Sequence, residues 1–112
     1  MEPRLASSVL VGALLRQAEA QGGFGMVLAK GEPNSGAVAL VLAERGGAQR
    51  YFERMLQSDG SYQWQEPRKT FENDSQLSEF LARRRKIDPD LWVVELTIAS
   101  AERFAAEMNG LN

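Results

Sequence analysis

The chain has 112 residues, of which 44% are hydrophobic and 25% charged, with a formal net charge of −2 and a pI near 5.2. This length fits a single globular domain over residues 1–112, and the acidic balance provides no overall attraction to nucleic acid or anionic lipid. Because cysteine and histidine are both absent, disulfides, thiol nucleophiles, imidazole bases and the usual zinc sites are excluded.

The first predicted element is a helix over residues 8–21. Leu10, Leu14 and Ala18 fall on one helical stripe, and Gly22-Gly23 follows as a stop. Residues 4–11 also alternate in the manner of a short strand that contains two valines. The beginning of this element therefore stays open between helix and strand.

Two apolar runs follow, at residues 24–30 and 36–44, separated by a loop-like segment at 31–35. They predict an antiparallel hairpin with one face of large side chains and one of small side chains. We expect the large face to meet helices, and the small face to be covered by a helix or a second subunit. The large set is Phe24, Met26, Leu28, Val38, Leu40 and Leu42, and the small set is Gly25, Val27, Ala29, Ala37, Ala39 and Ala43.

A second hairpin is predicted from strands at residues 49–57 and 61–66, because Asp59-Gly60 between them is a strong tight-turn signal. A helix capped by Asn73 or Ser75 then runs to about Lys86. Its predicted buried stripe is Leu77, Phe80, Leu81 and Ile87.

The segment Asp88-Pro89-Asp90 ends that helix, and residues 91–98 predict a last strand. A short helix follows a cap at Ser100 and stops at Asn109-Gly110. The order of elements predicts an α+β fold with a mainly antiparallel sheet of about five strands, made of two hairpins plus a late strand, packed with three helices. The expected core positions of the late strand and the last helix are Trp92, Val94, Leu96, Ile98, Ala101, Phe104, Ala105 and Met108.

Candidate site residues gather around the late strand. Asp88, Asp90 and Glu95 could bind a hard cation or act as an acid/base pair, and together with Arg84 and Trp92 they could line a ligand pocket. The structural reading is turn chemistry at the two aspartates and a core role for Trp92. We predict no catalytic residue, no metal site and no cofactor.

Two further patterns raise the question of nucleic acid. The basic run Arg83-Arg84-Arg85-Lys86 lies where a helix dipole favours cations, which is the preferred interpretation. The second hairpin carries aromatic residues beside arginines, but cross-strand packing is the commoner reason for such residues. Nucleic-acid binding is therefore not expected. The residues concerned are Arg50, Tyr51, Phe52, Arg54, Tyr62 and Trp64.

Several segments together form a recognisable pattern, above all Asp88-Pro89-Asp90-Leu91-Trp92-Val93-Val94-Glu95. The others are Arg4-Leu5, Ala13-Leu14-Leu15-Arg16, Lys30-Gly31-Glu32-Pro33 and Gly36-Ala37-Val38. On these residues the chain resembles the bacterial domain-of-unknown-function family DUF1491 over nearly its whole length. The resemblance implies a small, stand-alone cytoplasmic protein and brings no catalytic residues.

The combined expectation is a non-enzymatic cytoplasmic interaction domain that self-associates as a homodimer and could bind an unknown protein partner. No apolar run approaches the ~18 residues that span a bilayer, so a membrane role is not expected. The absence of cysteine fits a reducing cytosol. The alternative is a small-molecule-binding or carboxylate-based hydrolytic domain.

Overall fold

The computed structural model describes residues 5–44, 47, 49–67 and 71–108. The first element is a helix that begins at Ser7, so the strand alternative for the N-terminal segment is wrong over its described residues; Arg4 lies outside them, as does the stop predicted at Asn109-Gly110. The elements in chain order are α1 (Ser7–Ala20), β1 (Phe24–Ala29), β2 (Val38–Glu44), β3 (Gln49–Leu56), β4 (Tyr62–Gln65), α2 (Asp74–Ile87), β5 (Trp92–Ile98) and α3 (Ala101–Met108).

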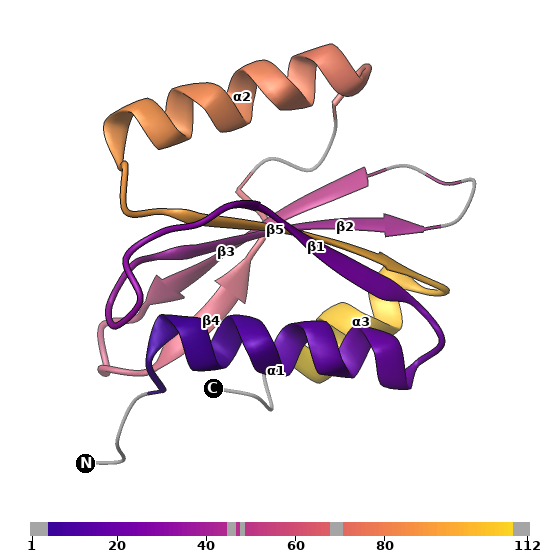
Figure 1. Cartoon of the computed structure of the whole chain (residues 1–112), viewed down its shortest axis with the longest axis horizontal. Coiled ribbons are helices and arrows are strands. Elements are labelled where there is room, and N and C mark those ends of the chain that lie inside the picture. Colours follow the sequence, from indigo (N-terminus) through magenta and orange to yellow (C-terminus); the bar gives the residue numbers. More distant parts are fainter. Residues whose placement is uncertain (1–4, 45–46, 48, 68–70, 109–112) are drawn as a thin grey trace.

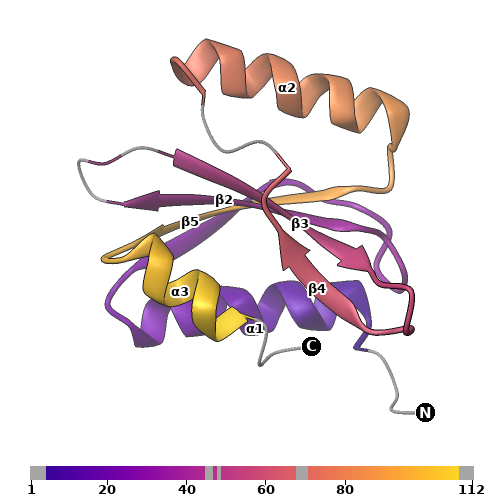
Figure 2. The same ribbon diagram turned by 180° about the vertical axis from the view of Figure 1, so that it is seen from behind.

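The five strands form one sheet in the order β1-β5-β2-β3-β4. Three of the four strand pairs are antiparallel, and β2 and β5 are parallel. Helix α2 covers one face of the sheet, while α1 and α3 cover the other (Figures 1 and 2). This arrangement confirms the predicted α+β fold with three helices and a mainly antiparallel sheet.

The predicted pairing of the first two strands is wrong, because β5 lies between them. β1 pairs antiparallel with β5, and β5 pairs in parallel with β2. The segment between β1 and β2 therefore crosses the beginning of β5 instead of forming a tight turn. We call residues 30–37 the crossing loop. The hairpin of β3 and β4 is confirmed, with Gly60 at φ +87° in its turn.

The inserted strand also changes which side chains of β1 and β2 share a face. Across the sheet, Gly25 aligns with Leu96, which aligns with Leu42. Gly25 and Val27 therefore share a face with Leu42 and Leu40 of β2, whereas Ala29, beyond a β-bulge, aligns with Val93 and lies on the α2 side. On the first of these faces Gly25 has no room for a side chain, because a Cβ atom would lie 2.5 Å from the Leu15 side chain of α1. Phe24 and Met26 point to the α2 side instead, and both are about half exposed.

Two hydrophobic cores lie on the two faces. The core beneath α1 and α3 includes the even-numbered residues of β5, Trp92, Val94, Leu96 and Ile98, which confirms their predicted role. The core beneath α2 is smaller. It contains Ala39, Val41, Tyr51, Leu77, Leu91 and Val93, with Ala29, Phe71, Phe80 and Leu81 packed against it.

The ends of the later helices follow local chemistry. The Asn73 side chain caps α2 by accepting from the Gln76 backbone N–H at 2.8 Å, and the Ser100 hydroxyl accepts from the Arg103 backbone N–H at 3.2 Å. Ile87 departs from the predicted stripe of α2. It is the last residue of the helix and is 79% exposed. Ala101 and Phe104 are buried as predicted, whereas the side chains of Ala105 and Met108 lie outside the described part of the chain.

The burial of Trp92 yields a stability prediction. Trp92→Ala should lower the free energy of unfolding by about 3–5 kcal/mol, because the surrounding core cannot collapse into the space that the indole leaves. Urea denaturation monitored by circular dichroism measures the change. Ile87→Ala is the matched control on an exposed side chain and should stay within about 0.5 kcal/mol of the parent protein. Equal urea midpoints for Trp92→Ala and the parent would contradict the core assignment.

Candidate functional site

The crossing loop is organised by one residue, Glu32. Its carboxylate accepts hydrogen bonds from the backbone N–H groups of Asn34 and Ser35, at 3.1 and 2.6 Å, and from the Ser35 hydroxyl at 3.1 Å. Its main-chain carbonyl accepts from the Gly36 N–H at 3.2 Å. These bonds close the loop on itself. The two backbone N–H groups lower the pKa of Glu32 from its ordinary value of 4.5.

The same loop is fixed to the beginning of β5. The indole Nε1 of Trp92 donates to the Glu32 carbonyl at 2.8 Å, and the Glu32 N–H donates to the Asp90 carbonyl at 3.1 Å. The approach is closest at Gly31, where a Cβ atom would lie 2.1 Å from the Asp90 carbonyl oxygen. Two of the segments that carry the family resemblance, residues 30–33 and 88–95, therefore contact each other.

The loop also holds the beginning of α1. The first backbone N–H groups of the helix, at Ser7 and Ser8, donate to the carbonyls of Asn34 and Pro33 at 3.1 and 2.8 Å. The Ser7 hydroxyl donates to the Gly36 carbonyl at 2.6 Å. These bonds satisfy N–H groups that a helix end otherwise leaves without partners. The N-terminus of α1 is consequently occupied by protein groups.

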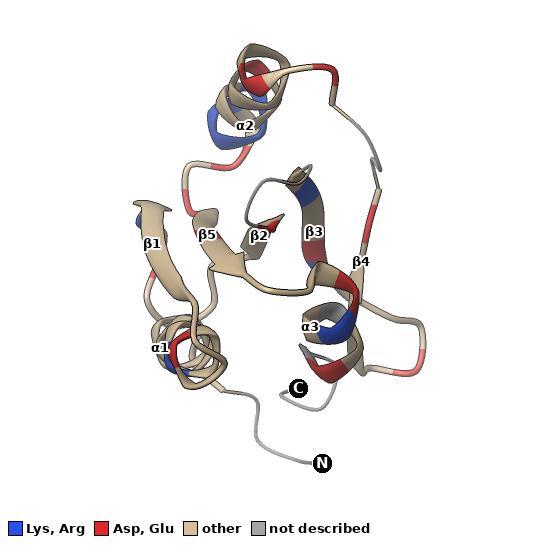
Figure 3. Ribbon diagram, turned by 90° about the vertical axis from the view of Figure 1, so that its right-hand side faces the viewer, with Lys and Arg blue, Asp and Glu red and all other residues tan. Residues whose placement is uncertain are grey.

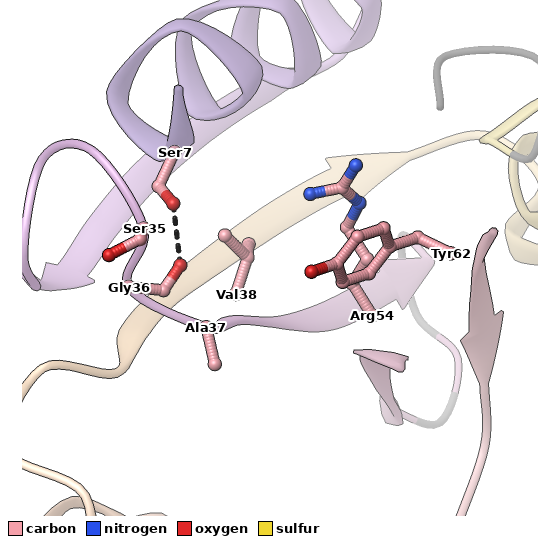
Figure 4. A pocket seen from close by; sticks show the side chains of 7 residues that line it. All are labelled: Ser7, Ser35, Gly36, Ala37, Val38, Arg54 and Tyr62. Atoms are coloured by element: carbon pink, nitrogen blue, oxygen red, sulfur yellow. Dashed lines mark hydrogen bonds between the residues drawn. The ribbon is translucent and has the colours of Figure 1, made fainter. Parts of the chain in front are cut away.

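A small pocket opens between this helix end, the crossing loop and the second hairpin (Figure 4). Its polar walls are the hydroxyl-bearing Ser7, Ser35 and Tyr62 and the guanidinium of Arg54, which lies 4.3 Å from the centre of the Tyr62 ring. The cavity is about 130 Å³, well below the ~300 Å³ at which ordinary ligand sites begin. Its size therefore restricts it to a small group. Gly36, Ala37 and Val38 complete the lining.

Among the predicted site residues, Arg84 forms an ion pair with Glu53. Its Nε donates to the Glu53 carboxylate at 2.6 Å, beneath α2. The Tyr51 hydroxyl donates to the same carboxylate oxygen. Burial raises the pKa of Tyr51, and the hydrogen bond with Glu53 raises it further. Tyr51 therefore stays protonated at neutral pH and links the sheet to α2.

The other four predicted residues are divided between turn and sheet. The Asp88 carboxylate accepts from the Asp90 N–H at 3.1 Å, as expected for turn chemistry. Trp92 is buried under α1 and α3, whereas Glu95 points to the α2 side, where it accepts from Gln49 at 3.3 Å. Trp92 and Glu95 thus lie on opposite faces of the sheet. Ligand binding by this set stays a prediction.

The residues of the pocket beside α1 could not be predicted from the sequence. Ser7, Ser35, Arg54 and Tyr62 come from three separate segments, and none belongs to a spacing motif. The aromatic residues near Arg54 were a partial signal, and the structure separates them: Tyr51 lies in the α2-side core, and Phe52 and Trp64 lie in the other core. They do not form a shared stacking surface.

The most exposed apolar strand is β1, at one edge of the sheet. Phe24 and Met26 are 53% and 52% exposed, Leu28 is 45% and Val27 is 38%. No charged residue occurs in the strand, which is drawn entirely in tan in Figure 3. This strand was predicted to face the core with its large side chains. It is exposed on the α2 side because α2 lies over the other strands and leaves β1 largely uncovered.

The same geometry decides between a helix and a second subunit as the cover of the small residues. Ala39 is fully buried in the core beneath α2, and Ala29 packs against that core. A helix of the same chain therefore covers the small residues of β2, which removes the reason to place a second subunit there.

Metal ligands and membrane-spanning helices are two further features to consider in the described part of the chain. Among these residues, no group of three or more acidic side chains is placed to hold a metal ion. Within the same residues, the helices are all too short or too polar to cross a bilayer.

Comparison with known proteins agrees with the family resemblance of the sequence. The family model for DUF1491, described as a protein of unknown function, matches residues 5–106. A crystal structure of a DUF1491 family protein from Caulobacter crescentus CB15 is 37% identical over 90% of this chain and 94% of that one, with a TM-score of 0.79. A solution structure of a protein from A. tumefaciens is 28% identical over 91% of this chain and 92% of that one, with a TM-score of 0.77. No protein with a curated description matches the sequence.

The depressed pKa of Glu32 predicts a pH dependence of stability. A carboxyl whose pKa is lower in the folded than in the unfolded protein stabilises the fold above the unfolded value, and the gain is lost as pH falls through the folded value. Glu32→Gln should therefore lower the melting temperature at pH 7, and the difference from the parent should shrink below about pH 4.5. Thermal melts across pH 7 to 3 measure it.

The control for this experiment is Glu79→Gln, at an exposed position of α2. It should melt like the parent protein at neutral pH. A melting-temperature difference for Glu32→Gln that stays constant down to pH 3 would contradict the proposed role of the ionised carboxylate.

Proposed function

The chain belongs to the DUF1491 family, and for this member we propose a non-enzymatic interaction domain that self-associates through strand β1. The observation that carries the proposal is the exposed, uncharged edge of the sheet. Large apolar side chains that are half exposed on an edge strand are unfavourable for a monomer, because both the apolar surface and the open strand edge favour association.

Burial of side chains elsewhere supports this choice of surface. The central strands β2 and β5 are covered on both faces, with most of their side chains buried. In β1, by contrast, every residue is partly or largely exposed. Its apolar residues therefore contribute little to the core of one subunit, which leaves association as the physical reason for their size.

The chemistry of the carboxylates and arginines supports a non-enzymatic role. The side chains of Arg84 and Asp88 are engaged in hydrogen bonds that hold α2 and the turn after it. Asp90 contributes its backbone groups to the same turn. These contacts stabilise the fold, which supports a structural role for the three residues. The absence of cysteine supports a place in a reducing compartment, and we propose the cytoplasm.

A second candidate function rests on the pocket beside α1. Arg54 with the hydroxyls of Ser35 and Tyr62 is suited to a small oxyanion such as phosphate, because guanidinium and hydroxyl groups donate hydrogen bonds to its oxygens. When inorganic phosphate is titrated into isotope-labelled protein, the NMR amide signals of Ser35 and Gly36 should shift until the site is saturated. The variant Arg54→Gln should abolish these shifts. Shifts that never saturate, or that persist in Arg54→Gln, would contradict the site.

The proposed self-association predicts a concentration-dependent dimer. The 12.4 kDa chain should sediment as a mixture of monomer and dimer at micromolar to millimolar concentration. Met26→Lys should weaken the dimer at least about tenfold, because two ammonium groups would meet in an apolar contact. Leu56→Lys, which charges a 62% exposed leucine on another strand, is the matched control and should leave the dimer unchanged.

Sedimentation of the parent protein as a pure monomer throughout this range would overturn the proposal. Equal weakening by Met26→Lys and Leu56→Lys would show that charge alone opposes association and that β1 is not the surface.

A further inference from the structure

The two edges of the sheet differ in how they are built. β4, at one edge, has four residues, exposes the glutamines Gln63 and Gln65, and is followed by Pro67. A short strand, polar side chains and a nearby proline are devices that keep a sheet edge from pairing with another chain. β1, at the other edge, has six residues with no charge and no proline. Residues 20–29 contain no charged side chain at all.

From this contrast we propose that two copies of the chain pair antiparallel along β1, edge to edge, and join their sheets into one continuous ten-stranded sheet. The inference rests on the proposed self-association and specifies its geometry. A two-fold axis perpendicular to the sheet relates the copies, which is the commonest symmetry of a dimer.

Pairing of this kind satisfies the open backbone edge of β1 and brings its exposed apolar side chains together. The outer backbone N–H and C=O groups, which face no strand of the same subunit, gain partners in the second copy. Phe24 and Met26 share the α2 side of the sheet, since they align with Thr97 and Glu95 of β5. The axis keeps this side common to both copies, so the four side chains gather into one apolar cluster. Because the strand is uncharged, no like charges oppose each other across the axis.

The size of the contact sets its strength. The exposed parts of the four apolar β1 side chains, Phe24, Met26, Val27 and Leu28, amount to roughly 700 Å² for both copies, below the ~1,000 Å² of a stable interface. The β-bulge between Val27 and Ala29 further limits regular pairing to Phe24–Val27. The dimer is therefore a weak one, which forms and dissociates instead of remaining permanently assembled.

The lack of cysteine in the natural sequence allows a direct test. In antiparallel pairing, opposed residues point to the same face, so a perpendicular two-fold axis must place one residue directly opposite its own copy. The Cα atoms of that pair lie about 4.5–5.5 Å apart, within reach of a disulfide. The test uses three single variants, Phe24→Cys, Met26→Cys and Val27→Cys. Each is oxidised under mild conditions, and the linked dimers are then separated from monomers by electrophoresis without reductant. Gly25 is left unchanged because of the close contact with α1.

One of these variants should form a disulfide-linked dimer, and Leu56→Cys, the control at an equally accessible leucine, should not. If Gly25 lies on the axis, Phe24 faces Met26 of the second copy. In that case none of the single variants links alone, but a mixture of Phe24→Cys and Met26→Cys links as a heterodimer. Either pattern supports edge pairing and identifies its register.

The remaining outcomes contradict the proposal and separate it from the self-association on which it rests. If the parent protein sediments as a dimer but neither a single β1 cysteine variant nor the mixture of Phe24→Cys and Met26→Cys links faster than Leu56→Cys, edge pairing is wrong and self-association stands. If the protein stays monomeric, both are wrong, and the β1 edge is left for a strand of a different protein. If all the β1 variants form disulfides at the same rate as Leu56→Cys, the links arise from random collision, and the proposed edge pairing is wrong.

Discussion

The crossing of β5 by the loop between β1 and β2 is the constraint on which the rest of the fold depends. Glu32 meets this constraint with both its side chain and its main chain. The carboxylate closes the loop, and the carbonyl receives the indole N–H of Trp92. The same loop then receives the first N–H groups of α1. One short segment thereby fixes the first helix and the three strands β1, β5 and β2 relative to one another.

The insertion of β5 also decides which surfaces remain for interaction. It displaces β1 to the edge and aligns Gly25 and Val27 of β1 with the large residues of β2. Gly25 then admits α1 close to the sheet, and Phe24 and Met26 are left on the side that α2 does not fully cover. The apolar edge is thus a consequence of topology, and its lack of charge and proline is a property of the sequence. Together they favour a strand partner over a small ligand, for which the described pocket is small.

Local features of the sequence predicted the elements well, and the pairing of strands poorly. The alternation in β5 identified its four core residues, and Asp59-Gly60 identified the second hairpin, because both signals lie within a few residues. No local pattern reveals that β5 inserts between β1 and β2, since that depends on contacts more than 50 residues apart, such as Trp92 with Glu32. Ile87 matched the helical period but falls at the helix end, where the sheet no longer covers it. The pocket residues are spread over three segments, and the aromatic residues near Arg54 were only a partial signal of them.

The position of β5 has a consequence for how the chain acquires its structure during synthesis. β5 is the last strand to leave the ribosome, yet it occupies the place between the first two strands. Until residues 92–98 emerge, β1 has no neighbour in the sheet and the crossing loop has nothing to cross. Only the β2-β3-β4 part can form earlier, because its pairings are local along the chain. The sheet is therefore expected to be completed only after β5 has been synthesised and has inserted, with the apolar β1 strand exposed to chaperones in the meantime.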